Sequence, residues 1–231
     1  MIGRILVTGA SRGIGRAIAL RLAAPGRELV LHGRDEAALA AVAAEAARRG
    51  AHVRTVAADL CAPDGVRRTA EAAGEEPLGA LVHNAGRAIV KPVGEITPEE
   101  WRHSLELGVT APFLLTQALL PRLAAGSAIV HVLSVAARQG FPGWGAYCAA
   151  KFALEGFSQC LRAELRGRGV RVVNVYPSAT ASELWDAVPG TWPRERMLAP
   201  GEVAEAVAYA LDRPPDVLVE EVAVGHLSGT L

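Results

Sequence analysis

The sequence predicts an α/β fold, a doubly wound and mainly parallel seven-stranded sheet with helices on both faces. Short apolar runs alternate along the chain with longer segments rich in Ala, Leu, Arg and Glu. The runs are apolar throughout, without alternating polar residues, which is typical of strands covered on both faces. The 231 residues are enough for one large domain, and no repeat or low-complexity linker divides them. We therefore expect one domain over residues 1–231.

The predicted strands follow the apolar runs in order. These runs are residues 5–8, 29–32, 53–57, 80–83, 127–133, 171–176 and 217–224. The segments between them predict helices over residues 14–22, from the end of the second strand through residue 45, and over residues 98–123, 145–166 and 200–212. Because strands and helices alternate regularly and a helix can return the chain to the same end of the sheet, we expect successive strands to run parallel.

One stretch, residues 178–199, is irregular and too long for a plain connection, which predicts a substrate-binding loop or lid. It contains Leu184, Trp185 and Trp192. The sequence allows two roles for Leu184, Trp185, Phe141 and Trp144. They either line an apolar pocket or pack the lid itself, and the sequence favours neither role.

Composition argues against several classes of partner. The formal net charge is zero and the charges are scattered, so we expect neither nucleic acid nor membrane as a partner. The N-terminal residues lack the features of a signal peptide, and no apolar run reaches membrane-spanning length, which favours the cytoplasm. The cysteines, Cys61, Cys148 and Cys160, have no metal-ligand spacing, so we expect free thiols and no metal site.

A glycine cluster follows the first predicted strand, in the stretch Thr8-Gly9-Ala10-Ser11-Arg12-Gly13-Ile14-Gly15. Where a strand turns into a helix, glycines permit a tight turn and close approach of the backbone. The helix N-terminus then offers free N–H groups and a partial positive charge to a pyrophosphate. The stretch predicts a dinucleotide site; the alternative is a structural turn.

The end of the second strand bears on which dinucleotide binds. A carboxylate at this place commonly binds the ribose hydroxyls of NAD. Here Gly33 takes that place and Arg34 follows, with Arg12 in the glycine loop nearby. Two guanidinium groups suit a 2′-phosphate, so we predict NADP(H), with NAD(H) less favoured. The alternative to phosphate binding is that Arg34 is merely solvated and that Asp35 caps the following helix. Asp59, after the third strand, either contacts the adenine or caps the next helix.

Tyr147 and Lys151 lie four residues apart on a predicted helix and so share one face. An unperturbed phenol has a pKa near ~10, and a fixed cation beside it favours the phenolate. Only Lys91 and Lys151 among the 24 basic residues are lysines. We therefore expect Lys151 to lower the pKa of Tyr147.

Taken together, these motifs resemble the short-chain dehydrogenase/reductase family, in its short single-domain branch with a Rossmann-like fold. The resemblance covers nearly the whole chain. It is carried by the glycine stretch, Asp59 between Ala and Leu, Asn84-Ala85-Gly86, and Ser134 thirteen residues before Tyr147-x-x-x-Lys151.

The resemblance implies a mechanism. Tyr147 would act as general acid/base, Ser134 would hydrogen-bond the substrate oxygen, and Lys151 would hold the nicotinamide ribose. It also implies the residues that bind the cofactor, namely Gly9, Ser11, Arg12, Gly13, Ile14, Gly15, Arg34, Asp59, Leu60, Asn84, Ala85, Gly86, Tyr147, Lys151, Pro177 and Thr180. Relatives of this type form homodimers or homotetramers.

Three positions depart from the family pattern. Gly108 stands where the family often has an asparagine whose carbonyl anchors a water next to the lysine; glycine keeps that carbonyl. Ser178 replaces the usual glycine after Pro177, and the C-terminal residues 222–226 lack the ending common in ketoacyl carrier-protein reductases. The leading hypothesis is NADPH-dependent reduction of a small ketone or aldehyde, or oxidation of the corresponding secondary alcohol. The alternative is an NADP(H)-binding sensor with little turnover.

Overall fold

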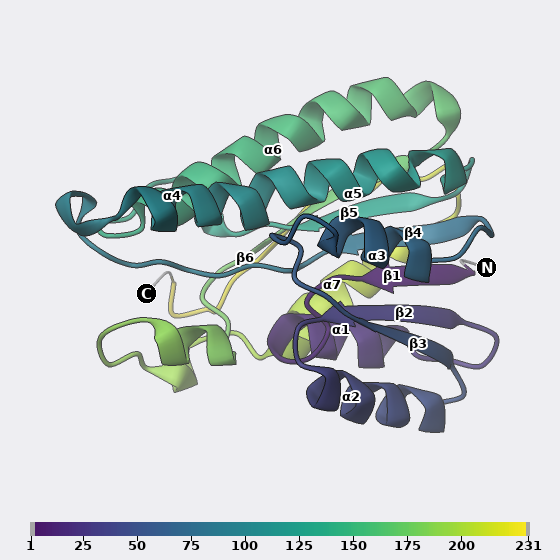
Figure 1. Cartoon of the computed structure of the whole chain (residues 1–231), viewed down its shortest axis with the longest axis horizontal. Coiled ribbons are helices and arrows are strands. Elements are labelled where there is room, and N and C mark those ends of the chain that lie inside the picture. Colours follow the sequence, from purple (N-terminus) through teal and green to yellow (C-terminus); the bar gives the residue numbers. More distant parts are fainter. Residues whose placement is uncertain (1–2, 230–231) are drawn as a thin grey trace.

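The computed structural model describes residues 3–229 and has one seven-stranded sheet in the order β3-β2-β1-β4-β5-β6-β7 (Figure 1). All adjacent strands are parallel, which confirms the predicted fold class. The strands are β1 Arg4–Val7, β2 Glu28–Gly33, β3 His52–Ala57, β4 Leu78–His83, β5 Ala128–Val132, β6 Arg171–Pro177 and β7 Glu221–Val224. Strand order reverses between β1 and β4, and the crevice beyond their carboxyl ends is where such sheets bind ligands.

The central strands are apolar throughout because both of their faces are covered. Side chains alternate between the faces of a strand, so Ile5 and Val7 pack into one core cluster and Leu6 into another. In β5 the same alternation separates Val130 from Ile129. These side chains are fully buried, so each strand contributes to two cores at once.

Helices cover the two faces of the sheet (Figure 1): residues of α1, α2 and α7 pack into one core cluster, and residues of α3, α5 and α6 pack into the other. The helices are α1 Gly13–Leu22, α2 Glu36–Arg48, α3 Gly65–Ala72, α4 Pro98–Leu105, α5 Ala111–Leu119, α6 Gly145–Leu165 and α7 Pro200–Leu211. The N-terminus of α1 and the segment 178–199 both lie at the carboxyl end of the sheet.

The helix predicted over residues 98–123 is interrupted. A π-helical turn, Glu106–Thr110, separates α4 from α5, and a 3₁₀ turn, Leu120–Arg122, ends the segment. Pro112 has no N–H to donate to the carbonyl of Gly108 four residues earlier, so regular α-helical bonding cannot continue here. The Ala111 N–H instead bonds to the carbonyl of Glu106, five residues back.

Two other predictions need correction. Helix α3 was not expected, because its short sequence is mostly polar and only a few residues of it are buried. Strand β7 begins at Glu221 instead of residue 217, because a turn in which Val217 N–H bonds to Pro214 O precedes it. Asp35 accepts a hydrogen bond from Ala38 N–H at 3.0 Å. It therefore caps α2, which was one of the two roles considered for this part of the sequence.

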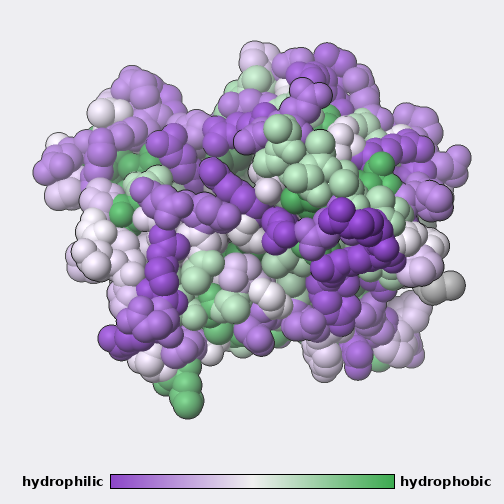
Figure 2. Space-filling model, turned by 90° about the horizontal axis from the view of Figure 1, so that it is seen from below, coloured by the Kyte–Doolittle hydropathy of each residue, from purple (hydrophilic) through white to green (hydrophobic). Residues whose placement is uncertain are grey.

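The surface seen in Figure 2 is mainly hydrophilic, and its hydrophobic residues form separate patches. Within residues 3–229, none of the helices combines the length and the apolar character needed to cross a bilayer. Phe113 and Leu114 of α5 and Phe152 of α6 are large apolar side chains that remain exposed.

Candidate active site

The glycines of the loop between β1 and α1 occupy positions that leave no room for side chains. Gly9 and Gly13 have positive φ angles of 66° and 55°, which L side chains rarely adopt. A Cβ on Gly15 would lie 2.1 Å from the Gly9 carbonyl oxygen and 2.4 Å from Nδ2 of Asn84. These glycines keep the backbone itself as the wall of the crevice, as a bound pyrophosphate requires.

Thr8 and Asn84 tie the carboxyl ends of β1 and β4 together. The Thr8 hydroxyl oxygen accepts hydrogen bonds from the backbone N–H groups of Asn84 at 3.0 Å and Ala85 at 3.1 Å. In return, the Asn84 side-chain amide donates to the carbonyls of Thr8 at 3.0 Å and Gly9 at 3.2 Å. The loop after β4 is thereby held against the glycine loop.

His32, at the end of β2, belongs to the same support and was not singled out by its sequence. Its Nδ1 accepts from the Gly9 N–H at 3.4 Å, and its Nε2–H donates to the Ala58 carbonyl at 3.1 Å. Burial lowers the pKa of His32 to about 4, so the ring is neutral in this arrangement. The contact joins residues 23 positions apart, which local sequence patterns cannot reveal.

These elements border a cleft of about 380 Å³. It is lined by the predicted cofactor residues Gly9, Ser11, Arg12, Gly13, Ile14, Arg34, Asp59, Leu60, Asn84, Ala85, Gly86, Tyr147 and Lys151. The cleft is also lined by residues outside that predicted set, among them Arg87, His103, Ser182 and Glu183. A backbone-walled loop at a helix N-terminus with cationic side chains at its edge fits a phosphorylated dinucleotide.

The edge of the cleft carries Arg12 and Arg34, which are both exposed. A Cβ on Gly33 would lie 3.2 Å from the Ser11 hydroxyl, so this end of β2 is closely packed. Asp59 does not cap α3; its carboxylate accepts from Cys61 N–H at 3.0 Å and shapes the turn beside the cleft. The exposed carboxylate of Glu183 reaches the glycine loop from the other side, 3.3 Å from where a Cβ of Gly13 would be.

Ser134, Tyr147 and Lys151 come together at the carboxyl end of β5. Ser134 starts a 3₁₀ turn, and its hydroxyl accepts from Ala136 N–H at 3.1 Å. The Lys151 ammonium donates to the Val132 carbonyl at 2.8 Å and lies 5.6 Å from the ring centre of Tyr147. The structure therefore brings the predicted trio into one site.

The pKa values in this site differ from the expectation. Burial raises the pKa of Tyr147 to about 12, although the hydrogen bond with Ser134 acts in the opposite direction. Burial likewise lowers the pKa of Lys151 to about 8. The expected lowering of the phenol pKa by Lys151 is therefore wrong for this structure, because burial removes water from the phenol and so disfavours the phenolate. Tyr147 keeps its proton at neutral pH.

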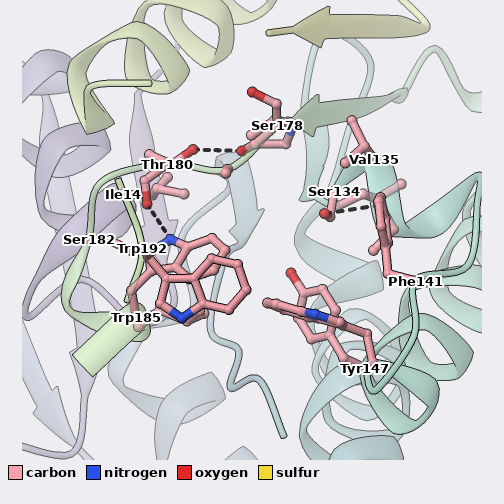
Figure 3. A pocket seen from close by; sticks show the side chains of 16 residues that line it. Ile14, Ser134, Val135, Phe141, Tyr147, Ser178, Thr180, Ser182, Trp185 and Trp192 are labelled. Carbon is pink, nitrogen blue, oxygen red and sulfur yellow. Dashed lines mark hydrogen bonds between the residues drawn. The ribbon is translucent and has the colours of Figure 1, made fainter. Parts of the chain in front are cut away.

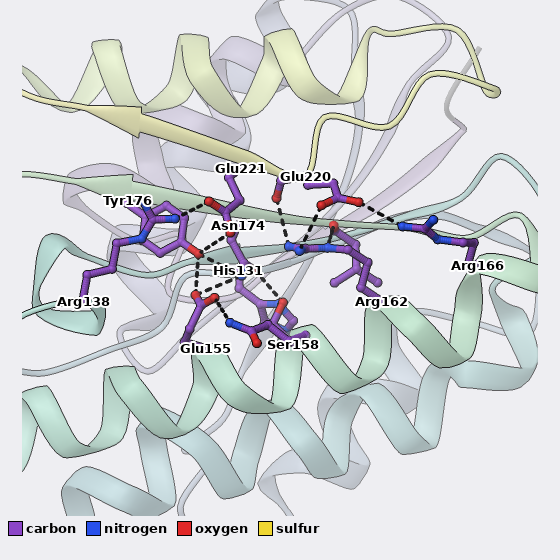
Figure 4. A network of polar contacts seen from close by, with 12 residues as sticks. His131, Arg138, Glu155, Ser158, Arg162, Arg166, Asn174, Tyr176, Glu220 and Glu221 are labelled. Atoms are coloured by element: carbon purple, nitrogen blue, oxygen red, sulfur yellow. Dashed lines mark hydrogen bonds and ion pairs between the residues drawn. The ribbon is translucent and has the colours of Figure 1, made fainter.

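Helix α6, which carries Tyr147 and Lys151, is anchored by a buried polar network (Figure 4). Ser158 of α6 donates to the Asn174 side-chain oxygen at 2.5 Å, and the Asn174 amide donates to the Glu155 carboxylate at 3.0 Å. Tyr176 of β6 also donates to Glu155. Because the network joins α6 to β6 over several contacts, it fixes the helix that positions the trio.

Gly108 packs directly against α6. A Cβ at this position would lie 2.8 Å from the Cβ of Ala150, so glycine allows the π-helical turn to approach the helix between Tyr147 and Lys151. A cavity of about 20 Å³ lies here, lined by Gly108, Ser104 and Lys151 among others. This volume is enough for one water molecule.

A second and mainly apolar pocket of about 130 Å³ adjoins the cleft (Figure 3). Its walls include Phe141, Trp144 and Leu133, and from the segment 178–199 Trp185 and Trp192. Tyr147 lines both this pocket and the cleft. Both roles considered for the aromatic residues therefore apply, since the indoles pack on one another and also line the pocket.

Three predicted cofactor residues do not line the cleft. Gly15 is buried behind the glycine loop, while Pro177 and Thr180 line the apolar pocket. The Thr180 hydroxyl donates to the Ser178 carbonyl at 3.0 Å and is 6% exposed, so it is committed within its own loop. Ser178 also binds locally, because its hydroxyl accepts from the His226 N–H at 3.2 Å.

Comparison with known proteins identifies the family. Residues 4–191 match the short chain dehydrogenase family. The chain belongs to that family. The predicted resemblance is confirmed, and with it the prediction of an oxidoreductase.

Individual relatives differ in substrate. The chain is 36% identical to D-threitol dehydrogenase of Mycolicibacterium smegmatis, covering 88% of this chain and 84% of the relative. It is 32% identical to sepiapterin reductase of Chlorobaculum tepidum, covering 98% and 97%. Among solved structures, an alcohol dehydrogenase of Thermococcus sibiricus complexed with 5-hydroxy-NADP is 28% identical, with a TM-score of 0.90 over 98% of this chain and 97% of that one. Further similar structures hold NADP or NADPH.

Proposed function

We propose that this protein is an NADPH-dependent reductase of a ketone or aldehyde, and that it oxidises the corresponding secondary alcohol in reverse. The observation that carries the proposal is the place of Tyr147, which lines both the dinucleotide cleft and the apolar pocket. A phenol at this junction can exchange a proton with a substrate oxygen while the carbon beside it faces the cleft.

NADP(H) is the cofactor that fits the cleft. The NADP-bound structures of relatives support it, as do the exposed guanidinium groups of Arg12 and Arg34 at the cleft edge. Two such groups can hold a 2′-phosphate with charge-assisted hydrogen bonds. When bound, the nicotinamide supplies the hydride, and the protein supplies binding, orientation and proton transfer.

The residues of the trio would divide the remaining work. Tyr147 keeps its proton at neutral pH, since its pKa is raised to about 12, and would donate it as negative charge develops on the substrate oxygen. The Ser134 hydroxyl would stabilise that oxygen by a hydrogen bond. Lys151, held by the Val132 carbonyl, would orient the ribose and return a proton to Tyr147 through the small cavity at Gly108.

Replacing Tyr147 with Phe tests the catalytic role directly. The variant removes only the hydroxyl, so we expect turnover to fall at least ~1,000-fold while NADPH binds with unchanged affinity. NADPH oxidation with a panel of carbonyls and calorimetric titration of the cofactor give the two readouts. Tyr209→Phe is the matched control, because Tyr209 lies exposed on α7.

The same experiment separates the alternative function, an NADP(H)-binding sensor. It is supported by two departures from the family pattern, namely Gly108 in place of the asparagine and Ser178 after Pro177. A wild-type protein that binds NADPH but oxidises it with none of the carbonyls would favour the sensor. Turnover that survives Tyr147→Phe would contradict the assignment of the proton donor.

We also propose a homodimer or homotetramer. Exposed Phe113, Leu114 and Phe152 place apolar area on neighbouring helices α5 and α6, which suits contact with a second copy. Light scattering of the wild type and of Phe152→Glu tests it, since a charge in such a contact should release monomers. A cytoplasmic location stays a prediction.

A further inference from the structure

The apolar pocket differs from an ordinary hydrophobic cavity in that three indole rings line it. Trp185 and Trp192 have ring centres 4.7 Å apart, and Trp144 lies 5.6 Å from Trp185. Trp144 also packs edge-on against the Tyr147 ring at 5.5 Å. We infer that the substrate is an uncharged, flat aryl ketone, or its benzylic alcohol, whose ring stacks in this pocket. The inference rests on the proposed reductase function and specifies its substrate class.

The polar atoms of two indoles are already used by the segment that carries them. Trp185 Nε1 donates to the Thr180 carbonyl at 2.9 Å, and Trp192 Nε1 donates to the Pro189 carbonyl at 3.2 Å. These rings therefore offer the pocket their faces and no free donor. Aromatic faces are best satisfied by another aromatic ring, offset or edge-on.

Charge is kept out of the pocket. Within residues 3–229, no Asp, Glu, Lys or Arg side chain lines it. The nearby Arg194 is bound elsewhere, to the Ser182 carbonyl at 2.6 Å and to Asp186 at 2.7 Å. A charged substrate group would lose its hydration here without gaining a partner, which is costly.

The size and the position of the polar atoms then limit the substrate. The pocket has a volume of about 130 Å³. An apolar cavity of about 150 Å³ holds a benzene molecule. This pocket has a similar volume and adjoins the cleft, so it admits one aromatic ring. Figure 3 shows Trp185 and Trp192 on one side, with Ser134 and the Tyr147 hydroxyl facing them from the other. A carbonyl held at Ser134 and Tyr147 places its aryl substituent between these walls.

Two ketones of matched size and a third that carries a charge test the inference. Acetophenone and cyclohexyl methyl ketone share a skeleton, but only the first is flat, and 4-acetylbenzoate adds a negative charge to the flat ring. Conjugation makes an aryl carbonyl intrinsically less reactive, so the quantity to compare is KM with saturating NADPH. We expect a KM for acetophenone about 10-fold below that of the cyclohexyl ketone. We expect the carboxylate KM to be at least ~100-fold higher than that of acetophenone.

Two variants tie the preference to the indole wall. Trp192→Leu keeps the wall apolar but removes an aromatic face, so the ratio of the two neutral KM values should fall toward one. Trp101→Leu is the matched control, because Trp101 is 42% exposed on α4 and does not line the pocket. The control should keep the wild-type ratio.

A binding measurement separates this inference from the proposed function. Saturation-transfer NMR on Tyr147→Phe with NADP⁺ reports the dissociation constant of each ketone without turnover. Selective binding of acetophenone with no wild-type turnover of any carbonyl would remove the reductase proposal and keep the aryl-binding pocket. Turnover with a KM for the cyclohexyl ketone or the carboxylate equal to or below that of acetophenone would overturn the inference and keep the reductase. Absence of acetophenone binding would also overturn it.

Discussion

The dinucleotide cleft and the apolar pocket meet at Tyr147 but are built in different ways. The floor of the cleft is backbone, exposed by Gly9 and Gly13 and braced by hydrogen bonds from Asn84. The pocket is made of large side chains, with Trp185 and Trp192 supplied by an irregular segment. A wall of backbone can bind the cofactor in any chain that has this loop. Substitution of the side chains that line the pocket can alter substrate selectivity without disturbing the fold.

The difference predicts how each region responds to mutation. The wall of the cleft is closely packed at Gly15, so even one added methyl group should matter there. The pocket is lined by residues that can be exchanged for others of similar size, so its variants should alter selectivity more than stability. Glu183 belongs to the segment 178–199, which supplies indoles to the pocket, yet its side chain lines the cleft. A change at Glu183 can therefore affect cofactor binding from the pocket side.

The largest expected effect is that of Gly15→Ala. Its Cβ would overlap the Gly9 carbonyl oxygen at 2.1 Å, so the glycine loop must move. We expect NADPH affinity to fall at least ~100-fold and stability to fall by about 1–3 kcal/mol, the usual cost of overpacking. Calorimetric titration with NADPH and urea unfolding measure the two effects.

Gly156→Ala is the control for Gly15→Ala. A Cβ on Gly156, which lies in α6, meets nothing within 4 Å. Alanine is the better helix former, so this variant should be more stable by about 0.5–1 kcal/mol and bind NADPH normally. Wild-type NADPH affinity in Gly15→Ala would show that the loop is not the tight backbone wall described above.

The second effect is a loss of stability in acid through His32. Its pKa is lowered from 6.5 to about 4 by burial, so the unfolded chain binds the proton more readily than the folded one. The stabilisation is therefore complete above pH 6.5 and is lost as the pH falls toward about 4. This difference in pKa corresponds to on the order of 3 kcal/mol.

Urea unfolding at pH 7 and at pH 4.5 measures this effect in the wild type and in His32→Gln. The variant should be less stable at pH 7, because the bond to Gly9 N–H is weakened, and should show a smaller drop on acidification. His226→Gln is the control, since His226 lies in the C-terminal segment away from the cleft. An equal drop in wild type and His32→Gln would assign the acid sensitivity to other groups, such as buried His131, whose pKa is lowered to about 3.

Most of the fold could be predicted because its signals are local. Continuous apolar runs predicted the parallel strands, and the glycine spacing predicted the turn between β1 and α1. The predicted helix over 98–123 failed at its middle, where Pro112 interrupts the α-helical bonding and Gly108 packs against Ala150 of a later helix. That contact is a matter of packing, which periodicity does not contain.

The site divides in the same way. Tyr147 and Lys151 were found from their spacing and Ser134 from the family resemblance, and the structure brings the three together. The contact of His32 with Gly9 is non-local and was missed. The direction of the Tyr147 pKa was wrong because desolvation depends on everything that surrounds the phenol, not on the nearest cation alone.

A smaller effect is expected at the cleft edge, where Arg34 is exposed. If its guanidinium meets a 2′-phosphate, Arg34→Ala should weaken NADPH binding about 10-fold and leave NADH binding unchanged. The ratio of the two dissociation constants is the measurement. Arg48→Ala, on the far end of α2, is the control. A ratio unaffected by Arg34→Ala would move cofactor selectivity to Arg12 or elsewhere.

The smallest effect is expected from Glu183, whose carboxylate lies beside the glycine loop. A bound pyrophosphate would bring like charges together there, so the side chain must turn away, which it can do because it is exposed. Glu183→Gln should therefore tighten NADPH binding by about 2–5-fold at low salt, and the gain should shrink as salt screens the repulsion. Glu195→Gln, exposed on the same segment but lining neither cavity, should bind like the wild type. Weaker binding in Glu183→Gln would mean that the carboxylate supports the glycine loop, and the segment would then belong to the cleft as much as to the pocket.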